Sequence, residues 1–166
     1  MSVIRPATRQ DVPAILQMIL ELAIYEKEPD AVRNTPDMLA QVLFGENPRV
    51  FVTMAENSAG EVQGFALWFL NYSTWEGVHG IYLEDLYVSP RARGEGHGKA
   101  LLKHLAATAV ENGYARVEWS VLDWNEPSIN FYRSLGARPM DGWSTFRLAG
   151  DALEHFGSSN VAALRG

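Results

Sequence analysis

The sequence predicts a single-domain α/β fold with a mixed central β-sheet and helices on both faces. The chain has 166 residues, 47% of them hydrophobic, which suits one domain with a substantial core. Segments typical of strands alternate with segments of helical periodicity, without repeats, linkers or low-complexity stretches. At the centre, an apolar strand, a glycine-rich turn and a helix follow one another directly. We assign residues 1–156 to the domain and expect 157–166 to be a flexible C-terminal tail.

The N-terminal segments begin with a short predicted strand over 2–5. A helix follows over 12–28, because its apolar residues recur at helical spacing, and Thr8 or Asp11 can cap it. The last turns of this helix are acidic, which fits either an exposed charged face or a ligand-binding one. A second helix over 36–43 begins with a Thr-Pro start signal and ends before a glycine.

The middle of the chain is predicted to supply most of the sheet. Two strands over 49–56 and 62–72 form a hairpin, because a turn-forming cluster joins them. The central strand over 81–88 leads through the glycine-rich turn into a helix that ends at an Asn-Gly pair near residue 113. Residues 116–121 form another predicted strand.

The C-terminal part is predicted to hold a helix over 128–135, which an Asn-Glu-Pro sequence opens and a glycine ends. Residues 138–140 and 144–148 are expected to form a closing hairpin around an Asp-Gly turn, and 151–156 a short helix.

The glycine-rich turn is a candidate anion site. Gly94, Gly96 and Gly98 permit positive φ and close approach of a ligand to the backbone. The positive end of the following helix, with Arg93 and Lys99 beside it, attracts phosphate. Cations at a helix start oppose the helix dipole, so a bound anion explains them better than chance surface charge. We expect a diphosphate ligand; an ordinary tight turn is the alternative, since the spacing departs from dinucleotide and P-loop motifs.

Composition excludes several classes of function. The 14 Lys and Arg against 20 Asp and Glu give a net charge of -6, which argues against a nucleic-acid binder and suits a cationic small substrate. No cysteine is present, so disulfides, thiolate catalysis and thiolate metal sites are excluded. The 4 histidines are scattered, and we expect no metal. Without a signal-like N-terminus or a run of membrane-spanning length, we expect a cytoplasmic protein without membrane contact.

Two motifs together resemble those of the GCN5-related N-acetyltransferases. The pattern Arg93-x-x-Gly96-x-Gly98 after a strand is similar to the loop with which this superfamily binds the pyrophosphate of acetyl-coenzyme A. The segment 124–137, in which an Asn precedes a helix with a Phe-Tyr pair and a closing Gly, is similar to its second motif. Segments 3–8, 21–26 and 82–88 resemble the diamine, or spermidine/spermine, branch, so the resemblance spans about 3–148.

The resemblance implies a GNAT-type acetyltransferase fold and acetyl transfer from acetyl-coenzyme A to a primary amine of a diamine, polyamine or thialysine-like amino acid. It assigns the pantetheine arm to the backbone of Leu86, Tyr87 and Val88, and further coenzyme contacts to Asn125 and Ser128. The residues that it assigns to the pyrophosphate are Arg93, Gly94, Glu95, Gly96, His97, Gly98 and Lys99.

The resemblance also implies two catalytic residues. Tyr132 would stand by the sulfur as general acid, and a phenol of pKa about 10 can protonate a leaving thiolate at modest cost. The alternative makes Tyr132 and Phe131 core aromatics. Glu84 is the candidate for binding or deprotonating the amine. A carboxylate and an ammonium differ by roughly six pKa units, so we expect Glu84 to orient the cation while water carries the proton away.

Asp85, Tyr25 and Trp75 complete the predicted amine site. Glu84 and Asp85 are adjacent on a strand and can line one site only if a β-bulge, usual in the superfamily, breaks the alternation. Such a bulge also frees an amide for the thioester carbonyl. The alternatives are a salt bridge for Asp85 and a core-covering role for Trp75. The side chain of His97 could approach phosphate or be a solvated loop residue.

A homodimer is expected from the resemblance, because the family often completes its amine pocket across a dimer interface. Other open functions are acetylation of an aminoglycoside or a protein lysine, a non-catalytic acyl-coenzyme A-binding module, and a nucleotide-binding regulator. The presence of both Tyr132 and Glu84 counts against the binding module.

Overall fold

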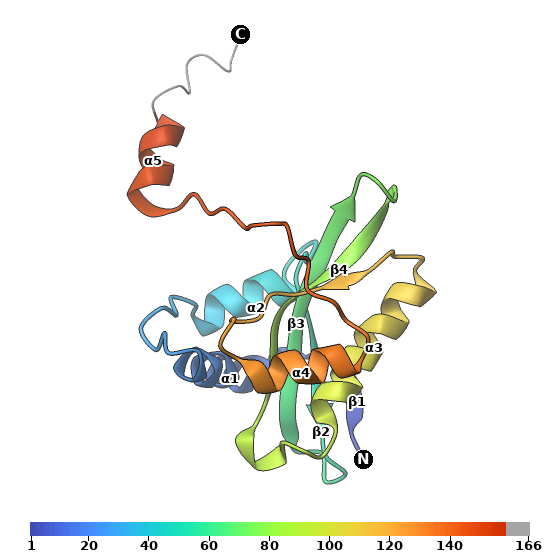
Figure 1. The fold of residues 1–166 in the computed structure, drawn as a ribbon. Coiled ribbons are helices and arrows are strands. Elements are labelled where there is room, and N and C mark those ends of the chain that lie inside the picture. Colours follow the sequence, from blue (N-terminus) through green and yellow to red (C-terminus); the bar gives the residue numbers. More distant parts are fainter. Residues whose placement is uncertain (159–166) are drawn as a thin grey trace. The chain divides into compact units, whose positions relative to one another are not determined.

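The computed structural model describes residues 1–158, and the chain divides into two compact units, residues 1–123 and 124–166. The first unit holds the β-sheet and the helices α1 to α3, and the second holds α4 and α5 (Figure 1). Among residues 1–158, no helix has the length and apolar character needed to cross a membrane.

The sheet has five strands in the order β1-β2-β3-β4-β5. The first four are antiparallel neighbours and β5 runs parallel to β4, so the predicted mixed sheet is confirmed. The strands are β1 (Val3–Pro6), β2 (Phe51–Glu56), β3 (Val62–Ser73), β4 (Val78–Val88) and β5 (Val117–Glu118).

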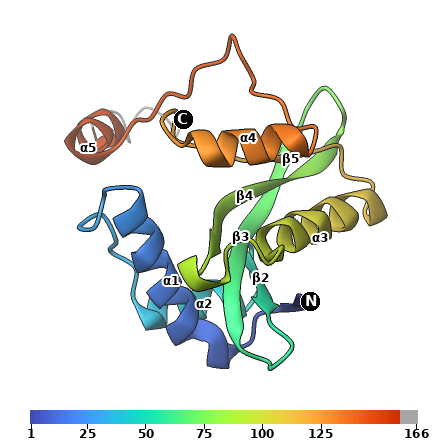
Figure 2. The same ribbon diagram turned by 60° about the horizontal axis from the view of Figure 1, so that its bottom comes forward.

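Helices cover both faces of this sheet, as the sequence predicts. Figure 2 shows α1 (Val12–Tyr25) and α2 (Pro36–Phe44) on one side and α3 (His97–Glu111) on the other. Fully buried residues such as Ile15 of α1 and Phe65 of β3 form the core under the first two helices. The other face is covered by the apolar stripe of α3, which consists of Leu101, Leu102, Leu105 and Ala109.

The predicted helix start signals are confirmed in detail. The Thr35 hydroxyl accepts a hydrogen bond from the backbone N–H of Met38 at 3.2 Å. A 3-10 turn, Arg9–Asp11, precedes α1, and the Asp11 carboxylate accepts from the backbone N–H of Thr8 at 2.7 Å. Side-chain oxygens thus satisfy backbone groups that a helix start leaves without partners.

The predicted strand over 116–121 is shorter than expected, since only Val117–Glu118 pairs with β4. The predicted hairpin of 138–140 and 144–148 is wrong: its turn forms, with the Trp143 N–H donating to the Met140 carbonyl at 3.4 Å, but neither arm is a strand. An isolated two-stranded hairpin is marginal without a third strand.

The second unit contains α4 (Glu126–Ser134) and α5 (Gly150–Ser158). The predicted helix over 151–156 is therefore present and extends by two residues into the segment that we expected to be a tail. The rest of that predicted tail, 159–166, lies outside the described residues.

Candidate active site

Strand β4 contains a β-bulge at Glu84. On the neighbouring strand Leu67 pairs with Asp85 and the next residue, Trp68, pairs with Leu83, so Glu84 is the extra residue. The structure therefore has the bulge that the family resemblance implies at this point. Because a bulge breaks the alternation of side chains, Glu84 and Asp85 need not point to opposite faces of the sheet.

Three carboxyl groups influence one another at this bulge: Glu84, Asp85 and Glu26, which caps the C-terminus of α1. Burial, followed by the charges of Glu84 and Glu26, raises the pKa of Asp85 to about 6. Desolvation, followed by the charge of Glu84, raises the pKa of Glu26. Each influence disfavours the ionised form, so the salt-bridge alternative for Asp85 finds no support. A cluster of this kind is stabilised by a cation that comes to lie beside it.

The edge of β4 beyond the bulge is open on the side of β5. Strand β5 pairs with β4 only at Ile81 and Tyr82, so within residues 1–158 the stretch from Leu83 to Val88 has a strand partner on β3 alone. Backbone groups along an open edge can hydrogen-bond an extended ligand. The family resemblance assigns the pantetheine arm to Leu86, Tyr87 and Val88 of this stretch.

The glycine-rich turn joins β4, through a 3-10 turn at Pro90–Ala92, to α3. Gly94 and Gly96 both have φ of 88°, a conformation that glycine adopts at low cost. Gly96 caps α3, and its carbonyl accepts from the N–H of Ala100 at 2.9 Å. The first backbone N–H groups of the helix have no partner within it, and they can meet an anion. The turn therefore fits the diphosphate of a coenzyme.

Arg93 links this turn to the end of α1. Its guanidinium lies over the rings of Tyr25, 5.4 Å from the centroid, and Tyr87, 6.0 Å from the centroid. Its Nε donates to the Val88 carbonyl at 3.2 Å. The Tyr87 hydroxyl donates to Glu21 at 2.5 Å, and burial followed by this carboxylate raises the pKa of Tyr87 to about 12. A residue predicted for the amine site, Tyr25, thus contacts one predicted for the coenzyme.

The His97 side chain is buried, with 2% of its surface exposed, so the interpretation as a solvated loop residue is wrong. Its imidazole lies between Ser2 and Glu95. The backbone N–H of His97 still belongs to the first turn of α3, where an anion would bind. The ring can be buried because both of its nitrogens have hydrogen-bond partners. Sequence spacing alone does not indicate these partners.

Trp75 is not brought to the bulge of its own chain. It is 88% exposed in the turn that joins β3 to β4. Glu84 lies six residues beyond Val78, where β4 begins, or about 20 Å away at the usual rise of a strand.

Asn125, Ser128 and Tyr132 belong to the second unit. Asn125 caps α4, as predicted, and its carbonyl accepts from the N–H of Ile129 at 3.0 Å. The rings of Phe131 and Tyr132 lie 5.6 Å apart. No residue of α4 itself is buried.

Sequence reasoning did not identify Glu26, Glu21 and Ser2 as individual site residues. The acidic last turns of the first helix were a signal for the two glutamates, because a ligand-binding face was one interpretation of them. Ser2 gave no such signal. Its partner is 95 residues away along the chain, and only the fold joins them.

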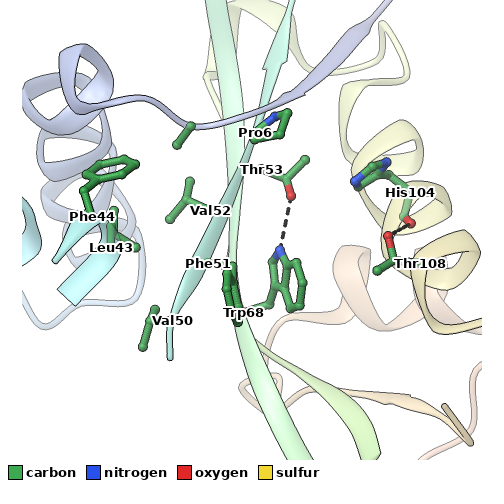
Figure 3. A pocket seen from close by; sticks show the side chains of 11 residues that line it. Pro6, Leu43, Phe44, Val50, Phe51, Val52, Thr53, Trp68, His104 and Thr108 are labelled. Carbon is green, nitrogen blue, oxygen red and sulfur yellow. Dashed lines mark hydrogen bonds between the residues drawn. The ribbon is translucent and has the colours of Figure 1, made fainter. Parts of the chain in front are cut away.

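A separate hollow of about 300 Å³ lies where β1 ends beside β2 (Figure 3). Its lining includes Phe51 and Trp68, whose rings lie 4.8 Å apart, and Thr53, which accepts from the Trp68 indole N–H at 3.1 Å. None of the predicted catalytic, coenzyme or amine residues lines this hollow. The groups suited to chemistry in the first unit lie instead along β4 and the glycine-rich turn. In the described part of the chain, no three His, Asp or Glu side chains have an arrangement that could hold a metal ion.

An open strand edge, a turn suited to an anion and a carboxylate cluster are features that fit a coenzyme-dependent acyltransferase. The model of the acetyltransferase (GNAT) family matches residues 14–137. The chain belongs to this family and is an N-acetyltransferase that uses acetyl-coenzyme A.

Its relatives include enzymes that act on small amines. A thialysine N-epsilon-acetyltransferase of Sus scrofa is 41% identical over 160 residues, which cover 90% of this chain and 94% of the relative. An L-ornithine N5-acetyltransferase of Arabidopsis thaliana is 31% identical and covers 95% of this chain and 89% of the relative. Among solved structures, an integron cassette protein from V. cholerae has a TM-score of 0.79 at 28% identity, covering 95% of this chain and 98% of its own.

Proposed function

We propose that this enzyme transfers an acetyl group from acetyl-coenzyme A directly to a primary amine of a small substrate with a second cationic group: a diamine, a polyamine or a thialysine-like amino acid. The observation that carries this proposal is the group of three carboxyls at the β4 bulge. Their mutual repulsion, and the burial that disfavours the ionised form of Asp85, are offset by a bound cation. The relatives named for thialysine and L-ornithine support the same class of substrate.

Acetyl-coenzyme A is the second substrate in this proposal. The edge at Leu86, Tyr87 and Val88 takes the pantetheine arm, and Asn125 and Ser128 make further contacts to the coenzyme. The diphosphate lies at the turn from Arg93 to Lys99, with its backbone N–H groups as donors. Two glycines at φ of 88° let these groups approach the ligand.

The reaction needs no covalent enzyme intermediate. The amine nitrogen forms a bond to the acetyl carbon, the carbon–sulfur bond breaks, and the amine proton leaves through water. Glu84 binds and orients the cationic substrate and helps its deprotonation. Tyr132 gives its phenol proton to the departing sulfur. Positioning of the two substrates supplies much of the rate enhancement.

The proposal includes a homodimer that works in the cytoplasm. Because Trp75 lies in the turn before β4, whose first residue is about 20 Å from Glu84, Trp75 of the partner subunit is the copy that contributes to the amine pocket. This arrangement gives the exposed indole a function.

A substrate panel tests the proposed class. We expect 1,4-diaminobutane and thialysine to be acetylated with a kcat/KM about tenfold or more above that of n-butylamine, which lacks the second cation. Glu84→Gln should lower kcat/KM for the diamine, whereas Glu111→Gln, an exposed carboxyl at the end of α3, should not. Equal use of butylamine and diamine would contradict the proposal. Preference for an aminoglycoside or a lysine peptide would assign another amine.

A further inference from the structure

The buried imidazole of His97 joins the N-terminus of the chain to the glycine-rich turn. His97 is the first residue of α3, and 2% of it is exposed. Its Nδ1 lies 2.7 Å from the hydroxyl of Ser2, which directly precedes β1. Its Nε2 lies 3.3 Å from the carboxylate of Glu95. Both ring nitrogens therefore have a partner, and the orientation of the ring is fixed.

The partners also define the hydrogen-bond direction. A carboxylate only accepts, so the Nε2 of His97 donates to Glu95. In the neutral imidazole Nδ1 is then the acceptor, and the Ser2 hydroxyl donates to it. The contacts form one directed chain from Ser2 through His97 to Glu95.

This chain ends inside the anion-binding turn. Glu95 stands between Gly94 and Gly96, which both have φ of 88°, so the backbone on either side of it is conformationally permissive. A carboxylate at this point opposes a diphosphate by charge. The contact with His97 holds that carboxylate at the start of α3 and limits the conformations of the turn.

We propose that His97 is a positioning residue for the coenzyme diphosphate, tying the turn to Ser2 and holding Glu95 in place. This role rests on the proposed function, because it concerns the same coenzyme site. In this role the His97 side chain does not bind the phosphate directly, because the imidazole is buried. Its consequence is that Ser2 affects coenzyme affinity.

An isosteric pair of variants at position 97 separates this role from simple filling of the core. His97→Asn keeps a polar group near the position of Nδ1, while His97→Leu has a similar shape without one. We expect calorimetry to give a dissociation constant for coenzyme A about 5- to 10-fold higher for the Leu variant than for the Asn variant. Ser2→Ala should weaken binding in the wild-type background and erase the difference between the pair. Ser58→Ala, in an exposed turn, is the matched control.

The second readout is a coenzyme fragment. Pantetheine lacks the diphosphate, so its affinity should be equal in all these variants. A loss shared by coenzyme A and pantetheine, or equal coenzyme A affinity in the Asn and Leu variants, would overturn the positioning role and leave His97 a packing residue. Failure of the wild-type protein to bind coenzyme A would instead refute the proposed coenzyme site. Thermal unfolding of each variant, measured without ligand, confirms that only folded protein is compared.

Discussion

At the scale of single residues, the carboxyls at the β4 bulge combine a destabilising arrangement with a proposed function in substrate binding. Asp85 is half-buried beside Glu84 and Glu26, and burial and both charges oppose its ionisation. Buried like charges cost stability unless a partner compensates them. In the proposed function a cationic substrate is such a partner, and the repulsion in the free enzyme would favour its binding.

The first prediction concerns stability. The carboxyl of Asp85 has a pKa of about 6 in the native chain and its ordinary value of 3.8 in the unfolded chain, so between these pH values the native state holds more protons. The free energy of unfolding therefore falls as pH rises from about 4 to about 6. Asp85→Asn should remove this loss and stabilise the protein near pH 8 by at most about 3 kcal/mol.

Urea unfolding of the wild type and of Asp85→Asn checks this prediction. The difference between their free energies of unfolding should shrink as the pH falls from about 8 toward about 4. Asp141→Asn, an exposed change in the second unit, controls for net charge. A gain in stability of Asp85→Asn that is equal near pH 8 and near pH 4 would contradict the titration assigned to Asp85.

The second prediction concerns protons released on binding. A diamine beside the cluster favours the ionised form of Asp85 and lowers its pKa. Binding of 1,4-diaminobutane near pH 6, where the free carboxyl is about half protonated, should therefore release protons. Calorimetry in two buffers of different ionisation enthalpy measures this release. Asp85→Asn should abolish most of it, whereas an unchanged release would place the titrating group elsewhere.

At the scale of elements, the open edge of β4 and the turn before α3 present the backbone groups suited to a coenzyme. Two glycines in left-handed conformation shape the turn. A third prediction compares Gly96→Ala with Gly60→Ala. Both positions have positive φ, 88° and 79°, and both have open space around the added methyl group. Each change should cost about 1 to 2 kcal/mol of stability for the left-handed conformation. Only Gly96→Ala should raise KM for acetyl-coenzyme A; an equal rise in both would show that general destabilisation causes it.

The sequence predicts elements best where local chemistry determines them. Thr35 and Asp11 act at helix starts through their own side chains, and their positions were predictable. Pairing with distant strands is different. The segments 138–140 and 144–148 have strand-like patterns, but a strand also needs a neighbour, and β5 has only two residues. The residue pattern of a segment does not indicate whether a neighbouring strand is present.

In the candidate site, too, features set by local sequence were easier to predict than features set by tertiary proximity. The bulge at Glu84 was expected from the family resemblance, and the structure confirms it. Glu26 and Ser2 belong to the site because the fold brings them close to β4 and α3. Their spacing along the sequence does not indicate this proximity. The catalytic role of Tyr132 stays a prediction.

At the scale of the whole molecule, the fourth prediction is the homodimer. Trp75 is far from the bulge of its own chain and 88% exposed, and a second copy would give it a partner. Light scattering after size exclusion should give twice the chain mass of 18.5 kDa. Trp75→Ala should raise KM for the diamine without raising KM for acetyl-coenzyme A. A monomer of full activity would contradict this arrangement.

The most direct test of the account is release of coenzyme A thiol from acetyl-coenzyme A with saturating diamine, measured for the wild type and Tyr132→Phe. The account predicts turnover by the wild type and a fall in kcat of about 100-fold in the variant, with coenzyme affinity retained, because only the phenol proton is lost. Coenzyme binding without turnover on any amine would contradict the proposed reaction. Turnover that is equal in both proteins would remove Tyr132 as the acid.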